Sequence, residues 1–274
     1  MEFSIDHFCP TLLPASNFNP EDDCERLRTA MAGLGTNEKE LIEVLGHRSA
    51  DQRAIIAQKY KSLFGKDLIT KLKSEISGHF YDTMEALCCS PAEFDACELH
   101  RAMKGAGTDE SVLIEILCTR TNHQIRQIKE AYGRSYVNIS ATNSPKNNKF
   151  IQVFASRSHA HLRALCQEYN NVGKKTLEDA LKSEMHGHTL QSFLTLVQCA
   201  NNKALYFAEK LKQSMKGAGT NDRMLIRIIV SRCEIDLGLI KKEFHKLTGD
   251  SLESWIEGDT SGDYRRLLLA LVHA

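Results

Sequence analysis

The chain has 274 residues, and its 35 Lys and Arg balance its 35 Asp and Glu, so the formal net charge at pH 7 is zero. Hydrophobic residues make up 42% and charged residues 26%, as in ordinary soluble proteins, which excludes a globally disordered chain. Without excess positive charge, the chain is expected to have no nucleic acid among its partners. An anionic membrane would bind only if something other than the side chains supplied positive charge.

The sequence favours a cytoplasmic protein with reduced thiols. Its longest late apolar stretch, 267–272, is far shorter than the roughly 18 residues of a membrane span. Residues 1–6 lack the basic and apolar regions of a secretory signal. The nine cysteines are odd in number and form no Cys-x-x-Cys pair, so we expect buried thiols rather than disulfides or a zinc site.

In chain order, residues 1–20 contain three prolines and predict an extended tail. The next segment predicts five short helices from its apolar spacing and its glycine breaks, over 21–31, 37–47, 51–62, 66–76 and 79–87. Thr36 is the predicted N-cap of the second of these helices. No stretch alternates with a period of two for long enough to form a strand, so the predicted fold class is all-α.

This pattern repeats along the chain. Three octapeptides nearly match, at 31–38, 103–110 and 215–222. An arginine lies 15 residues after the first glycine of each, and an aromatic residue lies 12 residues after that arginine. A fourth copy keeps the arginine and the aromatic residue without the octapeptide. The four pairs are Arg48 with Tyr60, Arg120 with Tyr132, Arg157 with Tyr169, and Arg232 with Phe244.

The spacing of the repeats reveals a gap. The intervals between successive arginines are 72, 37 and 75 residues, so the middle interval is short by half a repeat. The predicted organisation is a tail (1–20), a first repeat (21–90), a partial second repeat (91–141), a partial third repeat (142–200) and a fourth repeat (201–274). Because one copy is too small to bury its own core, neighbouring copies should share one. The partial copies then either join into a shortened composite repeat, which we favour, or leave apolar surface exposed.

The octapeptide closes one helix and opens the next. Carbonyl oxygens at a helix C-terminus lack intrahelical partners and carry the negative end of the helix dipole. Two glycines allow several of these oxygens to converge. In two copies an acid follows the first glycine by 42 residues, namely Glu75 after Gly33 and Asp259 after Gly217. Such an oxygen cage suits Ca²⁺ better than Mg²⁺, and with a single carboxylate it is weak and open to a lipid phosphate.

Taken together, these features resemble the annexin family. The resemblance rests on the Gly-x-Gly-Thr loops, on Glu75-Ile-Ser-Gly and Asp259-Thr-Ser-Gly-Asp-Tyr, and on Ser231-Arg-Cys-Glu-Ile-Asp-Leu, and it covers 17–272. It implies an all-α core of five-helix repeats stacked into a curved disc, whose convex face carries Ca²⁺ and docks on phosphatidylserine-rich membranes. We expect a monomer that is cytoplasmic and attaches peripherally to membranes when calcium rises, with an N-terminal tail able to contact protein partners.

The resemblance assigns the site residues. The first site would use the carbonyls of Met31, Gly33 and Gly35 with the carboxylate of Glu75, and the last those of Met215, Gly217 and Gly219 with Asp259. The second copy keeps the loop of Met103, Gly105 and Gly107, but its acid position is the neutral Asn147. The third copy keeps the acid, Glu184, but has no glycine loop in its sequence. We therefore predict two competent calcium sites rather than four.

Two other function classes compete with this interpretation. A helical repeat scaffold that binds proteins without calcium would keep the same helices, and half of the expected sites are incomplete. An enzyme is not predicted, because no Gly-x-Ser-x-Gly, P-loop or His-Glu-x-x-His motif occurs. The histidine pairs 159/161 and 186/188 are spaced i, i+2 and do not face one site on a helix. The repeated arginines are expected in structural salt links between helices.

Overall fold

The structure, a computed structural model, describes residues 8–33, 35–105, 107–136, 159–172 and 175–273, and all regular elements in these ranges are α-helices. The predicted all-α fold class is therefore confirmed. The chain divides into two compact units: unit 1 comprises residues 1–91 and 207–274, and unit 2 comprises residues 92–206. Among the described helices, none combines the length and the apolar character needed to cross a bilayer.

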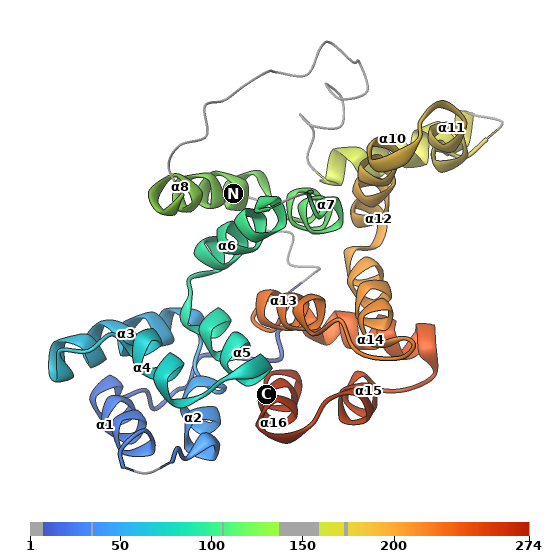
Figure 1. Cartoon of the computed structure of the whole chain (residues 1–274). Coiled ribbons are helices and arrows are strands. Elements are labelled where there is room, and N and C mark those ends of the chain that lie inside the picture. Colours follow the sequence, from blue (N-terminus) through green and yellow to red (C-terminus); the bar gives the residue numbers. More distant parts are fainter. Residues whose placement is uncertain (1–7, 34, 106, 137–158, 173–174, 274) are drawn as a thin grey trace. The chain divides into compact units, whose positions relative to one another are not determined.

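The first five helices of unit 1 form one repeat (Figure 1). They are α1 (Pro20–Ala30), α2 (Glu38–Leu45), α3 (Ala50–Phe64), α4 (Leu68–Glu75) and α5 (Gly78–Cys88), which confirms the five predicted helices to within a few residues. Local capping explains where they begin. Asn19 caps α1, a Ser49–Gln52 capping box starts α3, and Asp67 caps α4.

The last five helices of unit 1 repeat this arrangement. The set begins with the second part of α12 (Gly187–Met215) and continues with α13 (Asp222–Arg232), α14 (Leu237–Thr248), α15 (Leu252–Asp259) and α16 (Gly262–His273). Helix α12 is broken at Asn202, whose φ of −150° and ψ of 89° are not helical. The Asn202 side chain accepts the Leu205 N–H at 3.0 Å, as an N-cap does, so a new helix starts there.

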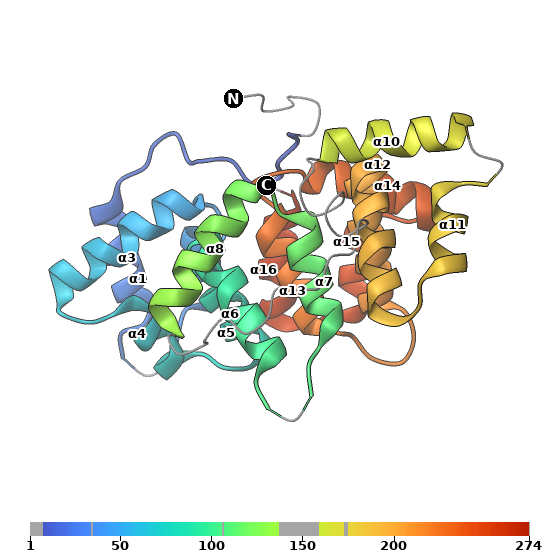
Figure 2. The same cartoon turned by 90° about the horizontal axis from the view of Figure 1, so that it is seen from above.

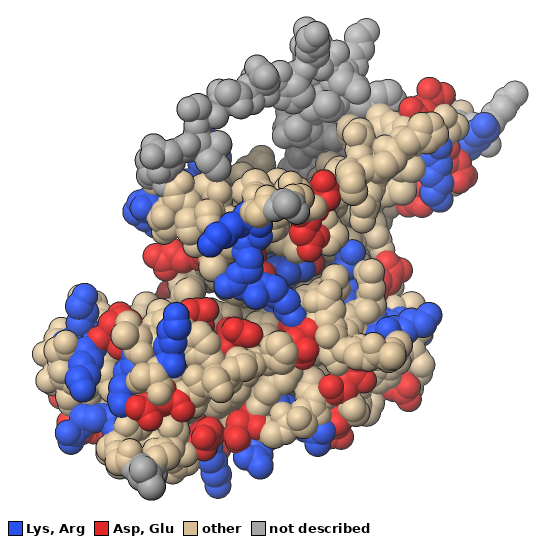
Figure 3. All heavy atoms as spheres, in the orientation of Figure 1, with Lys and Arg blue, Asp and Glu red and all other residues tan. Residues whose placement is uncertain are grey.

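The two repeats of unit 1 share one core although they lie at opposite ends of the sequence, whereas the sequence predicts a shared core only for neighbouring copies. Helix α5 packs against α13 and α16, and α16 also packs against α2 (Figures 1 and 2). The apolar side chains between them are fully buried and include Leu41, Leu45, Met84, Leu225, Ile229, Leu267 and Leu271. On the face of unit 1 seen in Figure 3, basic and acidic side chains lie interspersed.

The N-terminal segment of unit 1 is extended and is bonded to the last repeat. The Cys9 N–H donates to the Ile235 carbonyl at 2.9 Å, and the Gly238 N–H donates back to the Cys9 carbonyl at 2.9 Å. The Thr11 hydroxyl donates to the Leu271 carbonyl at 2.6 Å. The N-terminal segment is therefore hydrogen-bonded to the last repeat of the chain.

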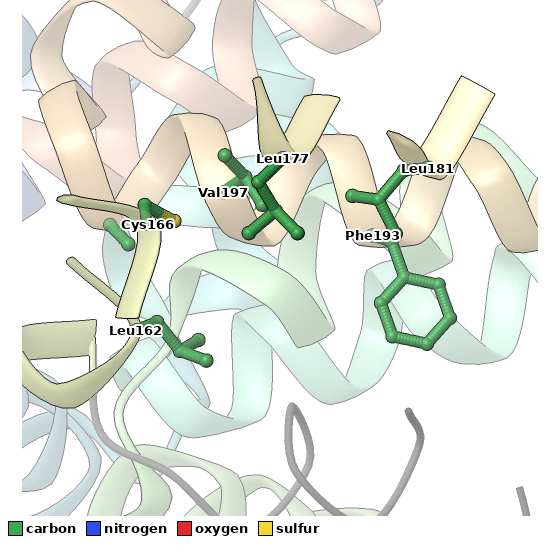
Figure 4. Close-up of a cluster of buried hydrophobic side chains, with 7 residues drawn as sticks. Leu162, Cys166, Leu177, Leu181, Phe193 and Val197 are labelled. Atoms are coloured by element: carbon green, nitrogen blue, oxygen red, sulfur yellow. The ribbon is translucent and has the colours of Figure 1, made fainter. Parts of the chain in front are cut away.

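Unit 2 consists of two three-helix groups. The first contains α6 (Pro91–Met103), α7 (Glu110–Thr119) and α8 (Asn122–Ser135), and the second contains α10 (His159–Val172), α11 (Leu177–Glu184) and the first part of α12. Each group has its own buried cluster, and that of the second group, with Leu162, Cys166, Leu177, Leu181, Phe193 and Val197, is shown in Figure 4.

Helix α7 of the first group contacts α12 of the second. The Cys118 thiol donates to the Ser192 carbonyl at 3.8 Å, and Glu110 lies 3.9 Å from His188. The front of the second copy and the back of the third thus belong to one compact unit. Asn147 and Arg157, which lie in the sequence between the two groups, fall outside the described residues.

At one equivalent position of the repeat, the exposure of an apolar side chain differs between the copies. Three residues before the repeated arginine stand Leu45, Leu117 and Ile229. Leu45 and Ile229 are 0% exposed in unit 1, whereas Leu117 is 49% exposed in unit 2. Helix α7 therefore presents an apolar side chain on the face that its counterparts in unit 1 bury.

This difference predicts unequal costs for the same substitution. Leu45→Ala removes a fully buried side chain and should lower the free energy of unfolding by about 3 kcal/mol. Leu117→Ala should lower it by less than about 1 kcal/mol, because most of that side chain's transfer energy is not gained on folding. Urea unfolding followed by circular dichroism measures both. Equal losses for the two variants would show that the Leu117 face is covered in solution.

Candidate functional site

Three loops share one backbone conformation. They connect α1 to α2, α6 to α7, and α12 to α13, and they coincide with the three octapeptides. Each contains two glycines with positive φ: 91° and 89° at Gly33 and Gly35, 106° and 104° at Gly105 and Gly107, and 111° and 93° at Gly217 and Gly219. A side chain would strain the backbone at such angles, so the glycines are required by conformation.

The same main-chain hydrogen bond closes each loop. The residue before the second helix donates its N–H to a carbonyl seven positions earlier: Asn37 to Ala30 at 2.8 Å, Asp109 to Ala102 at 2.8 Å, and Asn221 to Ser214 at 2.7 Å. The same residue then caps that helix with its side chain, as Asn37 does by accepting the Glu40 N–H at 3.2 Å. The prediction of Thr36 as the N-cap is therefore wrong. The adjacent asparagine takes that role and leaves the threonine hydroxyl for another partner.

The loop carbonyls named by the sequence have no protein partner among the described residues. No main-chain or side-chain donor in that part of the chain bonds the carbonyl oxygens of Met31, Gly33, Gly35, Met103, Gly105, Gly107, Met215, Gly217 or Gly219. These oxygens lie at or just beyond a helix C-terminus, where the helix dipole is negative. Each loop therefore has oxygen lone pairs available for a cation.

In the first and last repeats a distant carboxylate lies against the loop. The Thr36 hydroxyl is 3.3 Å from the Glu75 carboxylate oxygen Oε2, and the Thr220 hydroxyl is 3.1 Å from the Asp259 oxygen Oδ2. Each pair is separated by 39 residues, and each acid is the last residue of its helix, α4 or α15. The structure thus brings together both predicted pairings of a loop with an acid.

A glycine follows each of these acids at a fixed distance. Gly78, Gly187 and Gly262 stand three residues after Glu75, Glu184 and Asp259 and have φ values of 62°, 60° and 60°. The positive φ allows the chain to turn from the acid directly into the next helix. The recurrence of this glycine is a second sequence signal for the acid position.

Among the described residues, the central copies show no corresponding contact. Thr108, in the second loop, makes no hydrogen bond with Glu184 in the described part of the chain. Glu184 ends α11 as Glu75 ends α4. Asn147, the residue at the acid position of the second copy, lies outside the described residues.

The two carboxylates differ in their electrostatic surroundings. The Lys71 ammonium donates to Glu75 Oε1, and this hydrogen bond, with smaller contributions from Thr36 and Ser74, lowers the pKa of Glu75. The carboxylate is therefore ionised at neutral pH. Lys71 stands four residues before Glu75, and the residue four positions before Asp259 is Trp255.

The repeated arginines form structural salt links, as predicted, in the copies that the structure describes. The Arg48 guanidinium donates to both carboxylate oxygens of Asp23, at 2.7 and 2.8 Å, and Arg120 donates to both of Asp95 at the same distances. Each acid lies 25 residues before its arginine. This fixed offset of 25 residues is a sequence signal for the two partners.

In the last copy the repeated arginine is also paired with a carboxylate, but the acid comes from another position. Twenty-five residues before Arg232 stands Phe207, whose ring centroid lies 4.9 Å from the guanidinium carbon. Asp236 supplies the carboxylate instead, at 2.7 and 2.6 Å. Arg120 and Arg232 are buried and Arg48 is half-buried, and each guanidinium is paired with a carboxylate within the protein rather than positioned to bind phosphate. Arg157 lies outside the described residues.

Among the described residues, the other side chains that could form a metal or thiol site are the cysteines, histidines and acids. The nine cysteines all lie in the described residues as thiols, and burial raises the pKa of Cys118 and of Cys233 to about 12. Both thiols are therefore protonated at neutral pH. Within the described part of the chain, no group of three or more His, Cys, Asp and Glu side chains is placed to hold a metal ion.

The donor set of the two complete pairings fits calcium. Main-chain carbonyls and one carboxylate are hard oxygen ligands, and Ca²⁺ accepts six to eight of them in flexible geometry. The unpartnered loop carbonyls and the nearby acid provide such ligands without any sulfur or nitrogen donor. Calcium is the biological cation that this arrangement suits best.

Comparison with known proteins agrees with this chemistry. The sequence model of the family described as Annexin matches residues 22–87, 94–138, 143–196 and 206–271. Annexin A8 of Homo sapiens is 42% identical over 310 aligned residues, covering 96% of this chain and 95% of that protein, and annexin A4 of Homo sapiens is 41% identical over 308, covering 95% and 97%.

Solved structures are similar over nearly the whole chain. Annexin III superposes with a TM-score of 0.92 at 36% identity and covers 99% of both chains. A structure of annexin A8 has a TM-score of 0.88 at 42% identity and covers 98% of this chain and 99% of that one. A calcium-bound annexin (Sm)1 has a TM-score of 0.87 at 29% identity, covering 98% and 94%. With its family match, its sequence relatives and its fold in agreement, the chain belongs to the annexin family.

Proposed function

We propose that this protein binds anionic, phosphatidylserine-containing membranes reversibly through calcium ions held at two sites. Site 1 comprises the loop 31–35 with Glu75, and site 4 comprises the loop 215–219 with Asp259. The observation that carries the proposal is the threonine contact, which joins a loop of unpartnered carbonyls to one carboxylate in both repeats.

Membership of the annexin family supports calcium-dependent phospholipid binding in general. Members of this family are generally not enzymes, and we propose no catalytic activity for this chain. The family does not decide which copies bind the ion. That part of the proposal rests on the residues of this chain.

At site 1, the carbonyls of Met31, Gly33 and Gly35 and the carboxylate of Glu75 would hold the cation. Four protein groups leave part of the coordination shell of Ca²⁺ for an outside oxygen. The bound ion would supply the positive charge that a chain of zero net charge lacks, and an oxygen of a lipid phosphate could complete its shell. Site 4 would use Met215, Gly217, Gly219 and Asp259 in the same way.

The two sites lie close to each other within unit 1. His79 stands four residues after Glu75 of site 1, and Asp222 stands three residues after the loop of site 4. The ring nitrogen Nε2 of His79 lies 3.2 Å from the Asp222 carboxylate. Two weak sites on one body reinforce each other on a membrane, because the second contact forms at a high effective concentration. This arrangement supports attachment that depends steeply on calcium.

We further propose that the second and third repeats are each incomplete and contribute no complete calcium site. Two facts support this organisation. The family match covers 22–87 and 206–271 but only the shorter segments 94–138 and 143–196 in the middle. The alignment with human annexin A8 spans 310 positions, more than the 274 residues of this chain, so at least 36 of them have no counterpart here.

The remaining features of the proposal concern the protein in the cell. We propose a cytoplasmic monomer that becomes peripheral on cytosolic membrane faces when calcium rises. The N-terminal tail is the proposed contact for protein partners, and its described part is anchored on the last repeat through Cys9 and Thr11. A calcium-independent helical scaffold is the alternative, and the experiment below distinguishes the two.

Removing both acids should abolish membrane binding. In the double variant Glu75→Gln with Asp259→Asn, calcium-dependent sedimentation with phosphatidylserine vesicles should be lost while helicity is unchanged, because each site loses its only charged ligand. Each single variant should need at least about tenfold more calcium, since the two sites act together.

The third repeat provides a matched control for this experiment. Glu184→Gln makes the same chemical change at the same register position. In the described residues no hydrogen bond joins Glu184 to a glycine loop, so calcium dependence should stay as in the wild type. Calcium-dependent sedimentation of the double variant would refute the site assignment. Equal sedimentation of the wild type in calcium and in chelator would favour the scaffold.

The threonine contact should itself affect calcium affinity. Thr220→Val removes the hydroxyl that links the loop of site 4 to Asp259, and the calcium concentration for half-maximal vesicle binding should rise about two- to tenfold. Thr108→Val, in the loop without an acid, is the control and should leave that concentration unchanged. If the two variants behave alike, the hydroxyl does not position the acid.

A further inference from the structure

The acid of site 1 is already occupied by protein donors. Lys71 and Glu75 lie one turn apart on α4, and the Lys71 ammonium donates to Oε1 while the Thr36 hydroxyl reaches Oε2. Both side chains are half-buried, with exposed fractions of 24% for Lys71 and 19% for Glu75. An ammonium group thus neutralises the only charged ligand of this site.

No described lysine or arginine pairs with the acid of site 4. One turn before Asp259 stands Trp255, whose ring packs edge-on against Phe244 with centroids 5.3 Å apart and whose N–H donates to Asp250 at 3.2 Å. In the described part of the chain, the Thr220 hydroxyl is the only side-chain donor to the Asp259 carboxylate. Sites 1 and 4 therefore match in loop conformation and differ in what holds the acid.

We propose that Lys71 is a built-in competitor that makes site 1 bind calcium more weakly than site 4. This inference rests on the proposed function. To bind at site 1, the cation has to break the Lys71–Glu75 ion pair and share its surroundings with a displaced ammonium group. The cost is modest, because the lysine side chain is flexible and can move into solvent.

Because the two sites would differ in calcium affinity, they would fill in a fixed order. As calcium rises, site 4 fills first and makes the first membrane contact. Site 1 fills next, helped by the nearness of the surface to which site 4 is already attached. The lysine thereby sets the calcium concentration at which attachment through both sites begins.

The experiment isolates site 1 in an Asp259→Asn background. In that background, Lys71→Met keeps the aliphatic stem and removes the charge, and it should lower the calcium concentration for half-maximal binding to phosphatidylserine vesicles about two- to fivefold. Calorimetric titration with CaCl₂ in the absence of vesicles should show the same direction. The charge-conserving Lys71→Arg should not lower the calcium requirement.

A neighbouring lysine supplies the control for net charge. Lys73 is exposed on the same helix and makes no ion pair with any described residue, so Lys73→Met changes the net charge equally and should have no effect. In the Glu75→Gln background, where only site 4 acts, Lys71→Met should also have no effect.

The outcomes separate this inference from the proposed function. If the Asp259→Asn protein binds vesicles in calcium and Lys71→Met does not lower its calcium requirement, the competitor role is wrong and the proposed function stands. Equal shifts for Lys71→Met and Lys73→Met would also overturn it, in favour of a general charge effect. If the wild type fails to bind vesicles in calcium, the proposed function fails and this inference fails with it.

Discussion

The proposed calcium sites depend on one contact, in which a threonine hydroxyl bridges a loop and an acid that lie far apart in the sequence. Thr36 reaches Glu75, and Thr220 reaches Asp259, across 39 residues in each case. The loop alone offers only neutral oxygens, and the acid alone is one carboxylate on the surface. Their juxtaposition creates a concentration of negative potential that a hard cation can neutralise. The third loop has the same conformation, but in the described part of the chain its Thr108 makes no such contact, and we therefore propose no complete calcium site there.

The helical repeat that positions these groups depends on a buried arginine with a bidentate carboxylate. In two copies the acid comes from the first helix of the repeat, as Asp23 does for Arg48. In the last copy Asp236 replaces it, and Phe207 stands where the acid would be. Leaving a buried guanidinium without a carboxylate would be strongly destabilising, so the acid can change position but the pairing persists.

Much of this arrangement could be predicted from the sequence. The five helices of the first repeat follow from local apolar spacing and glycine stops, and the three glycine loops follow from recurrence in one register. Tertiary partners were harder to predict. Thr36 has the local signature of an N-cap, yet Asn37 caps the helix. The Thr36 hydroxyl instead donates a hydrogen bond to the Glu75 carboxylate. The Lys71–Glu75 pair has the ordinary i, i+4 spacing, and only the structure shows that the same acid faces a loop.

A crystal structure grown with calcium tests the two-site proposal most directly. We expect one ion at each of two places, with the carbonyls of the loops 31–35 and 215–219 and the carboxylates of Glu75 and Asp259 at about 2.3–2.6 Å from it. We expect no ion bound jointly by the loop 103–107 and Glu184. Ions absent from the first two loops, or an equally occupied site at 103–107, would contradict the claim that a carbonyl loop joined to its own acid makes the calcium site.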